Sequence, residues 1–264
     1  MDEFKEIRQR FDRAALQFGR EGRGIKAVLL PDMPSWIIEY ADKLFIRAFR
    51  RLVKTAEANK ILDVGCGVGR LTFKLSELGH TIGIDISCNM VKIAHEKAKK
   101  LGIDVDFCVM SNYRLGFVNE LADMILSSGV LEYIIDDEHL KAALNEFARV
   151  AKPGSKILLM EPITTKPLTH YGERKPPDYW SPVPSVFCLK VLQSRGVKLV
   201  AWTGICAEPL GSLAVLLGRI NIKLPKISLL TKAFIPGLFL TAALTQNAFK
   251  NASLLKAFLL QKQS

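Results

Sequence analysis

The chain has 264 residues, which is enough for one large domain with a full hydrophobic core. Its 49% of hydrophobic and 24% of charged residues are typical of a globular protein and exclude a disordered chain. The net charge of +11 leaves anionic partners open. Five cysteines without a Cys-x-x-Cys spacing, and four dispersed histidines, predict neither disulfides nor a metal site.

Two amphipathic helices are expected at the N-terminus. Apolar residues between Phe4 and Phe18 share one helical face, and those between Trp36 and Leu52 share another. We expect both helices to cover a cleft in the domain that follows, and assign residues 1–58 to this helical lid. The start of the chain lacks the basic and apolar pattern of a secretion signal, which predicts a cytoplasmic protein.

The segment Ile61–Arg70 is the most informative part of the sequence. An apolar run ends in Asp63, and three glycines follow at alternate positions, where the backbone can turn tightly and approach a ligand. The N–H groups of the helix that begins next face that ligand. The third glycine of a dinucleotide fingerprint would fall on Arg70, and no Gly-Lys-Ser/Thr follows, so neither common nucleotide loop fits.

A second predicted strand, Thr81 to Asp85, also ends in an acid. In a doubly wound sheet its carboxyl end lies beside that of the strand before the glycines. Asp85 can therefore accept hydrogen bonds from both hydroxyls of a ribose. Ser87 occupies the N-cap position of the next helix, which makes Asp85-Ile86-Ser87 a strand-to-helix turn.

Later segments complete an alternating α/β pattern. Ala122–Tyr133 is typical of a fourth strand with its loop, and Lys152-Pro153-Gly154 predicts a turn into a fifth strand at Ile157–Pro162. The remaining predicted elements are a helix at 185–195 and strands at 197–203 and 254–261.

Four motifs in this order carry a family resemblance. They are Asp-Val-Gly-Cys-Gly-Val-Gly-Arg from position 63, Gly-Ile-Asp-Ile-Ser from 83, Ser-Ser-Gly-Val-Leu-Glu-Tyr from 127 and Ala-Lys-Pro-Gly-Ser from 151. Over about residues 35 to 203 the chain resembles the class I S-adenosylmethionine-dependent methyltransferases, in particular those that act on small molecules, quinones or lipids. The resemblance implies a Rossmann-like, doubly wound α/β sheet of seven strands in the order 3-2-1-4-5-7-6, with strand 7 antiparallel.

The resemblance also implies S-adenosylmethionine as the cofactor and assigns residues to it. Those around its methionine part are Asp63, Gly65, Cys66, Gly67 and Gly69. Asp85 holds the ribose, Ile86 and Met90 flank the adenine, and Ser128 lies near the sulfonium. Cys66 is expected to serve as a small residue in a tight loop rather than as a nucleophile.

One position departs from the family pattern. Where relatives often have Gly-Asp-Ala after the third strand, this chain has Met110-Ser111-Asn112. The usual carboxylate for the adenine amino group is therefore missing, and either Ser111 or the Asn112 amide is left to accept that hydrogen bond.

The last third of the chain carries most of the charge. Residues 181–264 contain ten Lys or Arg and the single acid Glu208, which places +9 of the net charge there. The family pairs its last two strands as a hairpin, so residues 206–253 form a helical insertion between the core, 59–205, and the last strand, 254–264. Its cations lie among Leu, Ile and Phe, which suits an anionic membrane surface, the wall of an apolar acceptor pocket, or core with a solvated lysine face.

Catalysis needs the acceptor and the methyl in line, with water excluded and without a metal. An oxygen or carbon acceptor must also lose a proton. The candidate bases are Glu161 at the end of the fifth strand and His170 in the proline- and aromatic-rich loop 162–184, which is the expected acceptor-binding segment. Tyr133 is a candidate for orienting the acceptor. The alternatives are capping for Glu161, an exposed loop position for His170 and packing for Tyr133.

The predicted function is methyl transfer to the oxygen, nitrogen or carbon of a small, apolar or lipid-like acceptor, with the protein either free in the cytoplasm or peripheral at a membrane. The first alternative is an RNA methyltransferase acting on tRNA, suggested by the charge. It is less favoured because the cations lie among apolar residues and no Asn-Pro-Pro-Tyr motif is present. The second alternative is a non-catalytic protein that binds S-adenosylmethionine.

Overall fold

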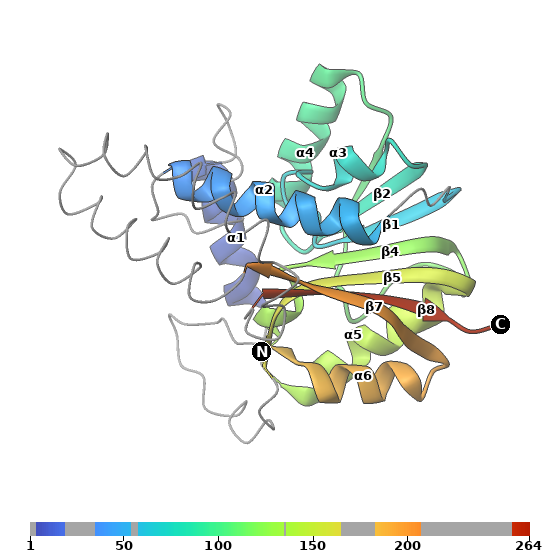
Figure 1. Ribbon diagram of the computed structural model, residues 1–264. Coiled ribbons are helices and arrows are strands. Elements are labelled where there is room, and N and C mark those ends of the chain that lie inside the picture. The colour runs from blue at the N-terminus through green and yellow to red at the C-terminus, as the bar shows by residue number, and fades with distance from the viewer. Residues whose placement is uncertain (1–3, 19–34, 54–57, 135, 165–182, 207–254) are drawn as a thin grey trace.

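A computed structural model describes residues 4–18, 35–53, 58–134, 136–164, 183–206 and 255–264 (Figure 1). Seven strands form one sheet in the order β3-β2-β1-β4-β5-β8-β7. They are β1 Lys60–Val64, β2 His80–Asp85, β3 Asp106–Val109, β4 Ala122–Ser128, β5 Ala151–Thr164, β7 Val197–Cys206 and β8 Leu255–Lys262. β8 runs antiparallel to both neighbours. A further two-residue strand, β6 (Val183–Pro184), pairs with β5. Strands 6 and 7 of the prediction are thus β7 and β8, and the predicted fold class is confirmed.

Helices cover both faces of this sheet, because its central strands are apolar on both sides. In β5, Ile157 and Leu159 face the core cluster that includes α5 (Asp137–Val150) and α6 (Ser185–Gln193). Leu158 and Met160 face the opposite cluster, with α2 (Ser35–Leu52) and α3 (Thr72–Leu75). α4 (Cys88–Leu101) connects β2 to β3.

All strands except β8 point their carboxyl ends toward one edge of the sheet, on the left in Figure 1, and α1 (Lys5–Phe18) lies beyond that edge. Ligands of doubly wound sheets bind at this carboxyl edge. The two N-terminal helices have different positions. α2 packs on the sheet face through residues such as Leu44 and Phe49, whereas α1 crosses the edge.

The predicted turn at Lys152-Pro153-Gly154 is wrong, because these residues lie inside β5. Ala122 of β4 pairs with Ala151 of β5, and Met124 of β4 pairs with Lys156 of β5. Between these two pairs β5 has more residues than β4, so it forms a bulge. Gly154 has φ +79°, a conformation that favours glycine. The Pro-Gly pair kinks the strand without ending it.

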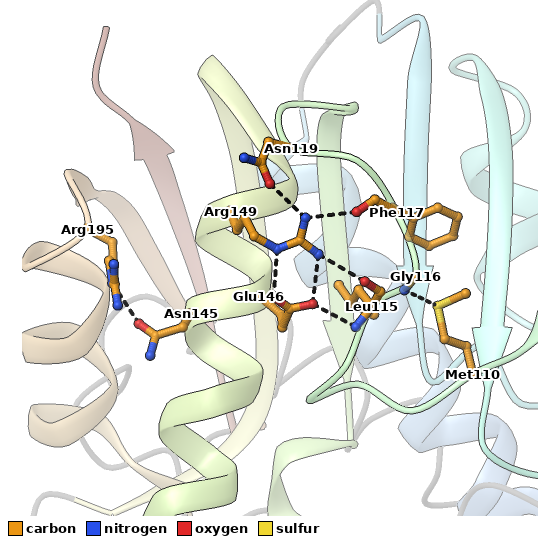
Figure 2. A network of polar contacts seen from close by, with 9 residues as sticks. All are labelled: Met110, Leu115, Gly116, Phe117, Asn119, Asn145, Glu146, Arg149 and Arg195. Atoms are coloured by element: carbon orange, nitrogen blue, oxygen red, sulfur yellow. Dashed lines mark hydrogen bonds and ion pairs between the residues drawn. The ribbon is translucent and has the colours of Figure 1, made fainter.

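The connection from β3 to β4 is held by Arg149, in the last turn of α5 (Figure 2). Its guanidinium donates to the carbonyl oxygens of Leu115 and Phe117, at 2.9 and 2.8 Å, and forms two bonds with Glu146. Glu146 in turn accepts the N–H of Leu115 at 2.7 Å. One ion pair therefore fixes a connection that has no helix of its own.

Within the described ranges, no helix has the length and hydropathy needed to span a membrane.

Candidate functional site

The glycine-rich loop after β1 is tied directly to β2. The N–H groups of Gly65 and Cys66 both donate to the carbonyl oxygen of Ile84, at 2.8 and 2.9 Å. Gly65 has φ +73°, and a Cβ atom there would lie 2.1 Å from Cγ2 of Val130, in the loop after β4. Gly65 is thus required both by its conformation and by the close approach of the β4 loop.

Two acids end the adjacent strands β1 and β2. Asp63 is buried and accepts a 2.6 Å bond from Oγ1 of Thr72, the first residue of α3. Asp85 accepts the N–H of Gly67 at 2.9 Å with one oxygen and the N–H of Ser87 at 2.8 Å with the other. Burial raises the pKa of each carboxyl to about 6. The two acids and the glycine loop therefore form one unit.

The loop holds three other candidate residues, Gly67, Gly69 and Cys66. Gly67 and Gly69 have φ +53° and +83°, and a Cβ at Gly69 would lie 2.6 Å from the ring of Phe73. Cys66 is buried, and burial followed by the charges of Asp85 and Asp63 raises the pKa of its thiol. The thiol is thus held in its protonated, weakly nucleophilic form.

Glu161 lies in β5 and is fully buried. Both carboxylate oxygens accept a hydrogen bond from the N–H of Val130, at 3.2 and 3.1 Å. One of them also accepts a hydrogen bond from the Ser127 hydroxyl, at 3.1 Å. Burial raises the pKa of this carboxyl to about 7, against the lowering effect of those hydrogen bonds. Glu161 thereby holds the loop between β4 and the 3₁₀ helix η2 (Leu131–Tyr133).

Tyr133, at the end of η2, lies under α1. Its ring meets that of Phe11 edge-on, with the centroids 5.0 Å apart, and the guanidinium of Arg10 lies 5.5 Å from its centroid. Burial, then the neighbouring Glu132 charge, raises the pKa of the phenol, so the hydroxyl remains protonated. His170 lies outside the described residues.

A profile of the methyltransferase domain family matches residues 61–154. The chain is 33% identical over 125 residues to phosphoethanolamine N-methyltransferase 1 of Triticum aestivum, covering 47% of this chain and 23% of the relative. It is 31% identical over 114 residues to the ubiquinone biosynthesis O-methyltransferase of Brucella anthropi, covering 43% and 44%. Residues 61–154 therefore carry a methyltransferase domain. The chain spans less than half the length of these two relatives.

Solved structures show the same fold. The N-methyltransferase NodS of Bradyrhizobium japonicum, in complex with S-adenosyl-L-homocysteine, matches with a TM-score of 0.60 at 12% identity, over 97% of this chain and 100% of NodS. The resemblance inferred from the four motifs is confirmed, and S-adenosylmethionine is the cofactor that this resemblance implies.

Two buried hydroxyls at the carboxyl edge fit such a cofactor. Oγ of Ser128, which ends β4, and Oγ of Ser111, just after β3, have no hydrogen-bond partner within the described part of the chain. A buried polar group left unpaired costs about 1–3 kcal/mol, which a cofactor hydrogen bond would recover. Asn112, beside Ser111, is half-buried. A third such hydroxyl, Ser155, lies in the β5 bulge and belongs to another part of the molecule.

α1 covers part of the methyltransferase cofactor region. Met90, in α4, is fully buried and packs with Ala15 of α1 and Val68 of the glycine loop. Ile86 is half-buried in the turn between β2 and α4. Of the two residues expected beside the adenine, Met90 is thus held by α1 and Ile86 remains partly open to solvent.

Two residues of this region have no counterpart in the sequence prediction. Asp12 of α1 accepts hydrogen bonds from the Ser87 hydroxyl, at 2.5 Å, and from the N–H of Asn89, at 3.1 Å. These two bonds fix α1 to the start of α4. Glu132 is buried beside Tyr133. Glu132 could have been found from its place in the Ser-Ser-Gly-Val-Leu-Glu-Tyr motif. Asp12 had no such signal, because its partners lie more than 70 positions away.

Proposed function

We propose that the protein is an enzyme that transfers a methyl group from S-adenosylmethionine to a small acceptor bound between η2 and α1. One observation carries the proposal: Asp85 holds the glycine loop through the N–H of Gly67, and Asp63 holds Thr72 at the start of α3, at the carboxyl edge of β1 and β2 inside the segment that matches the methyltransferase family.

In this proposal, Asp85 accepts hydrogen bonds from the ribose hydroxyls with the lone pairs that the N–H groups of Gly67 and Ser87 leave free, since a carboxylate offers about four acceptor positions. Asp63 and the loop glycines surround the methionine part, and Ser111 or Asn112 accepts the adenine amino group. S-adenosylmethionine supplies a methyl on a positive sulfur, which is open to attack in line by a lone pair. α1 helps to exclude water from this edge.

Which residue removes the proton of the acceptor is a separate question. Glu161 directs both carboxylate oxygens to the backbone of Val130, so we propose that it positions the β4 loop instead of removing a proton. His170 remains a candidate base, and Glu132, which is buried beside Tyr133, is added as a second candidate. Tyr133 keeps its proton and is suited to donate a hydrogen bond to the acceptor.

Aromatic side chains at this edge support the proposed acceptor class. Phe4 stacks on Tyr113 with the ring centroids 4.5 Å apart, and Phe11 packs on Tyr133. An apolar or lipid-like body suits such rings. The basic segment 206–253 lies outside the described residues, and its proposed contact with an anionic membrane, like a cytoplasmic or peripheral location, rests on sequence alone.

The decisive experiment is transfer of label from radiolabelled S-adenosylmethionine to fractions of a cell extract. Label in the organic phase or in small metabolites supports the proposal. Label in RNA would establish the alternative that the +11 charge suggests. Cofactor binding without any labelled product, in every fraction, would support the non-catalytic alternative.

Membrane contact needs its own measurement. The full chain is sedimented with neutral phosphatidylcholine vesicles and with vesicles that also contain phosphatidylglycerol. Binding only to the anionic vesicles, and its loss at high salt, is the expected result. Equal or absent sedimentation with both vesicle types would refute the proposed peripheral location.

A further inference from the structure

Arg10 has an unusual environment for a half-buried cation. Its guanidinium lies 5.5 Å from the ring centroid of Tyr133 and 5.9 Å from that of Phe11. No hydrogen bond or ion pair to this side chain occurs in the described structure, although Arg70 and Arg149 each have a carboxylate partner at 2.6–2.7 Å. Its hydrogen-bond donors are therefore not used by the folded chain.

The position of Arg10 places these donors at the methyl-transfer edge. Tyr133 follows Ser128, the last residue of β4, by one short turn and η2. Two residues beyond Arg10, Asp12 binds the start of α4 through Ser87. α1 thus runs from the cofactor side of the edge to η2, and Arg10 lies over the η2 end.

We propose that Arg10 binds an anionic group, a carboxylate or a phosphate, carried by the methyl acceptor. This inference rests on the proposed function and narrows its acceptor to a molecule with an anionic end and an apolar body. A guanidinium presents paired N–H donors that match such a group in two parallel bonds. The rings of Phe11 and Tyr133, on which the guanidinium lies, provide the apolar surface beside it.

The charges around Arg10 agree with this assignment. Asp12 faces Ser87 and Asn89, and Glu132 lies beside the Tyr133 phenol, where its charge contributes to the raised pKa of that group. Glu6 and Arg8 have partners of their own. In a purely structural role, the side chain of Arg10 would only pack over the aromatic rings and leave its charge in water.

The test uses the full chain saturated with S-adenosylhomocysteine and two probes that differ only in the anionic group, phenyl phosphate and phenol. Isothermal titration measures the affinity of each probe for the wild type, for R10Q and for the control R13Q, which alters an exposed position on the same helix. Phenyl phosphate is expected to bind about tenfold or more tightly than phenol to the wild type and to R13Q, and this preference is expected to disappear in R10Q.

The outcomes separate the two proposals. If S-adenosylhomocysteine itself does not bind, the proposed function fails. If it binds normally but phenyl phosphate shows no preference over phenol, or keeps its preference in R10Q, the role of Arg10 is refuted. Thermal unfolding of R10Q and R13Q guards against a loss of fold. A short single-stranded RNA that binds through Arg10 while phenyl phosphate does not would overturn the small-acceptor assignment.

Discussion

The carboxyl edge of the sheet has two regions that are built differently. In the cofactor region, Asp63, the glycine loop and Asp85 lie within 23 consecutive residues and are joined mainly through backbone N–H groups. In the proposed acceptor region, Arg10, Tyr133 and Glu161 come from three distant segments and make their contacts through side chains. Backbone binding can be encoded by a short motif, whereas side-chain recognition depends on tertiary packing.

The largest predicted effect tests the close approach of Gly65, in the first region, to Val130, in the loop after β4. In G65A, the new methyl group would overlap Cγ2 of Val130, and alanine would be strained at φ +73°. We expect a loss of about 3 kcal/mol or more in the free energy of unfolding, together with loss of S-adenosylhomocysteine binding. Urea unfolding and isothermal titration measure the two quantities.

G154A is the matched control for that variant. Gly154 has φ +79°, but nothing lies within 4 Å of the position that a Cβ would take. Only the backbone strain remains, so about 1 kcal/mol of destabilisation and unchanged cofactor affinity are expected. If the two variants lost the same stability, the close approach of the β4 loop to Gly65 would not be the reason for glycine there.

The second prediction concerns the connection that carries Ser111 and Asn112. R149A removes the guanidinium bonds of Arg149 that Figure 2 shows and leaves the carbonyl oxygens of Leu115 and Phe117 without this donor. We expect about 2–3 kcal/mol of destabilisation in urea. R195A, which removes a single exposed bond to Asn145, should cost less than about 1 kcal/mol, and an equal cost would argue against a special role for Arg149.

The sequence predicted the cofactor region well because its physics is local. An apolar run, alternating glycines and terminal acids determine strand, turn and helix, and the βαβ crossover places β2 beside β1. The bulge at 152–154 was missed because Pro-Gly chemistry indicates a kink and does not reveal whether pairing continues beyond it. The contacts of Arg10 and Asp12 were missed because no local pattern tells which partner an amphipathic helix meets.

The third prediction tests the ribose assignment of Asp85. D85A should weaken S-adenosylhomocysteine binding by about 1–3 kcal/mol, because the ribose hydroxyls lose their acceptor. D104A, at an exposed acid in the connection between α4 and β3, should bind as the wild type does. Isothermal titration of both variants checks this. Unchanged affinity in D85A would show that Asp85 does not bind the ribose.

The smallest predicted effect is a pH dependence that has opposite signs for binding and for stability. Burial raises the pKa of Asp85 from 3.8 to about 6 in the free protein. Ribose hydroxyls donate to the charged form, so S-adenosylhomocysteine affinity should fall by about fivefold as the pH drops from 6 to 5. In D85N, this part of the dependence should be absent, and any remainder would report Asp63, whose pKa is also raised to about 6.

Stability of the free protein should follow the other sign. Between about pH 4 and 6 the folded chain holds a proton on Asp85 that the unfolded chain has released, so the contribution of this group is present below pH 4 and lost as the pH rises through 6. Urea unfolding of wild type and D85N at pH 4.5, about 5.5 and about 6.5 measures the difference. As the pH drops, the raised pKa of Asp85 predicts a lower affinity and a higher stability. If affinity and stability instead changed in the same direction, the buried carboxyl of Asp85 would not control binding.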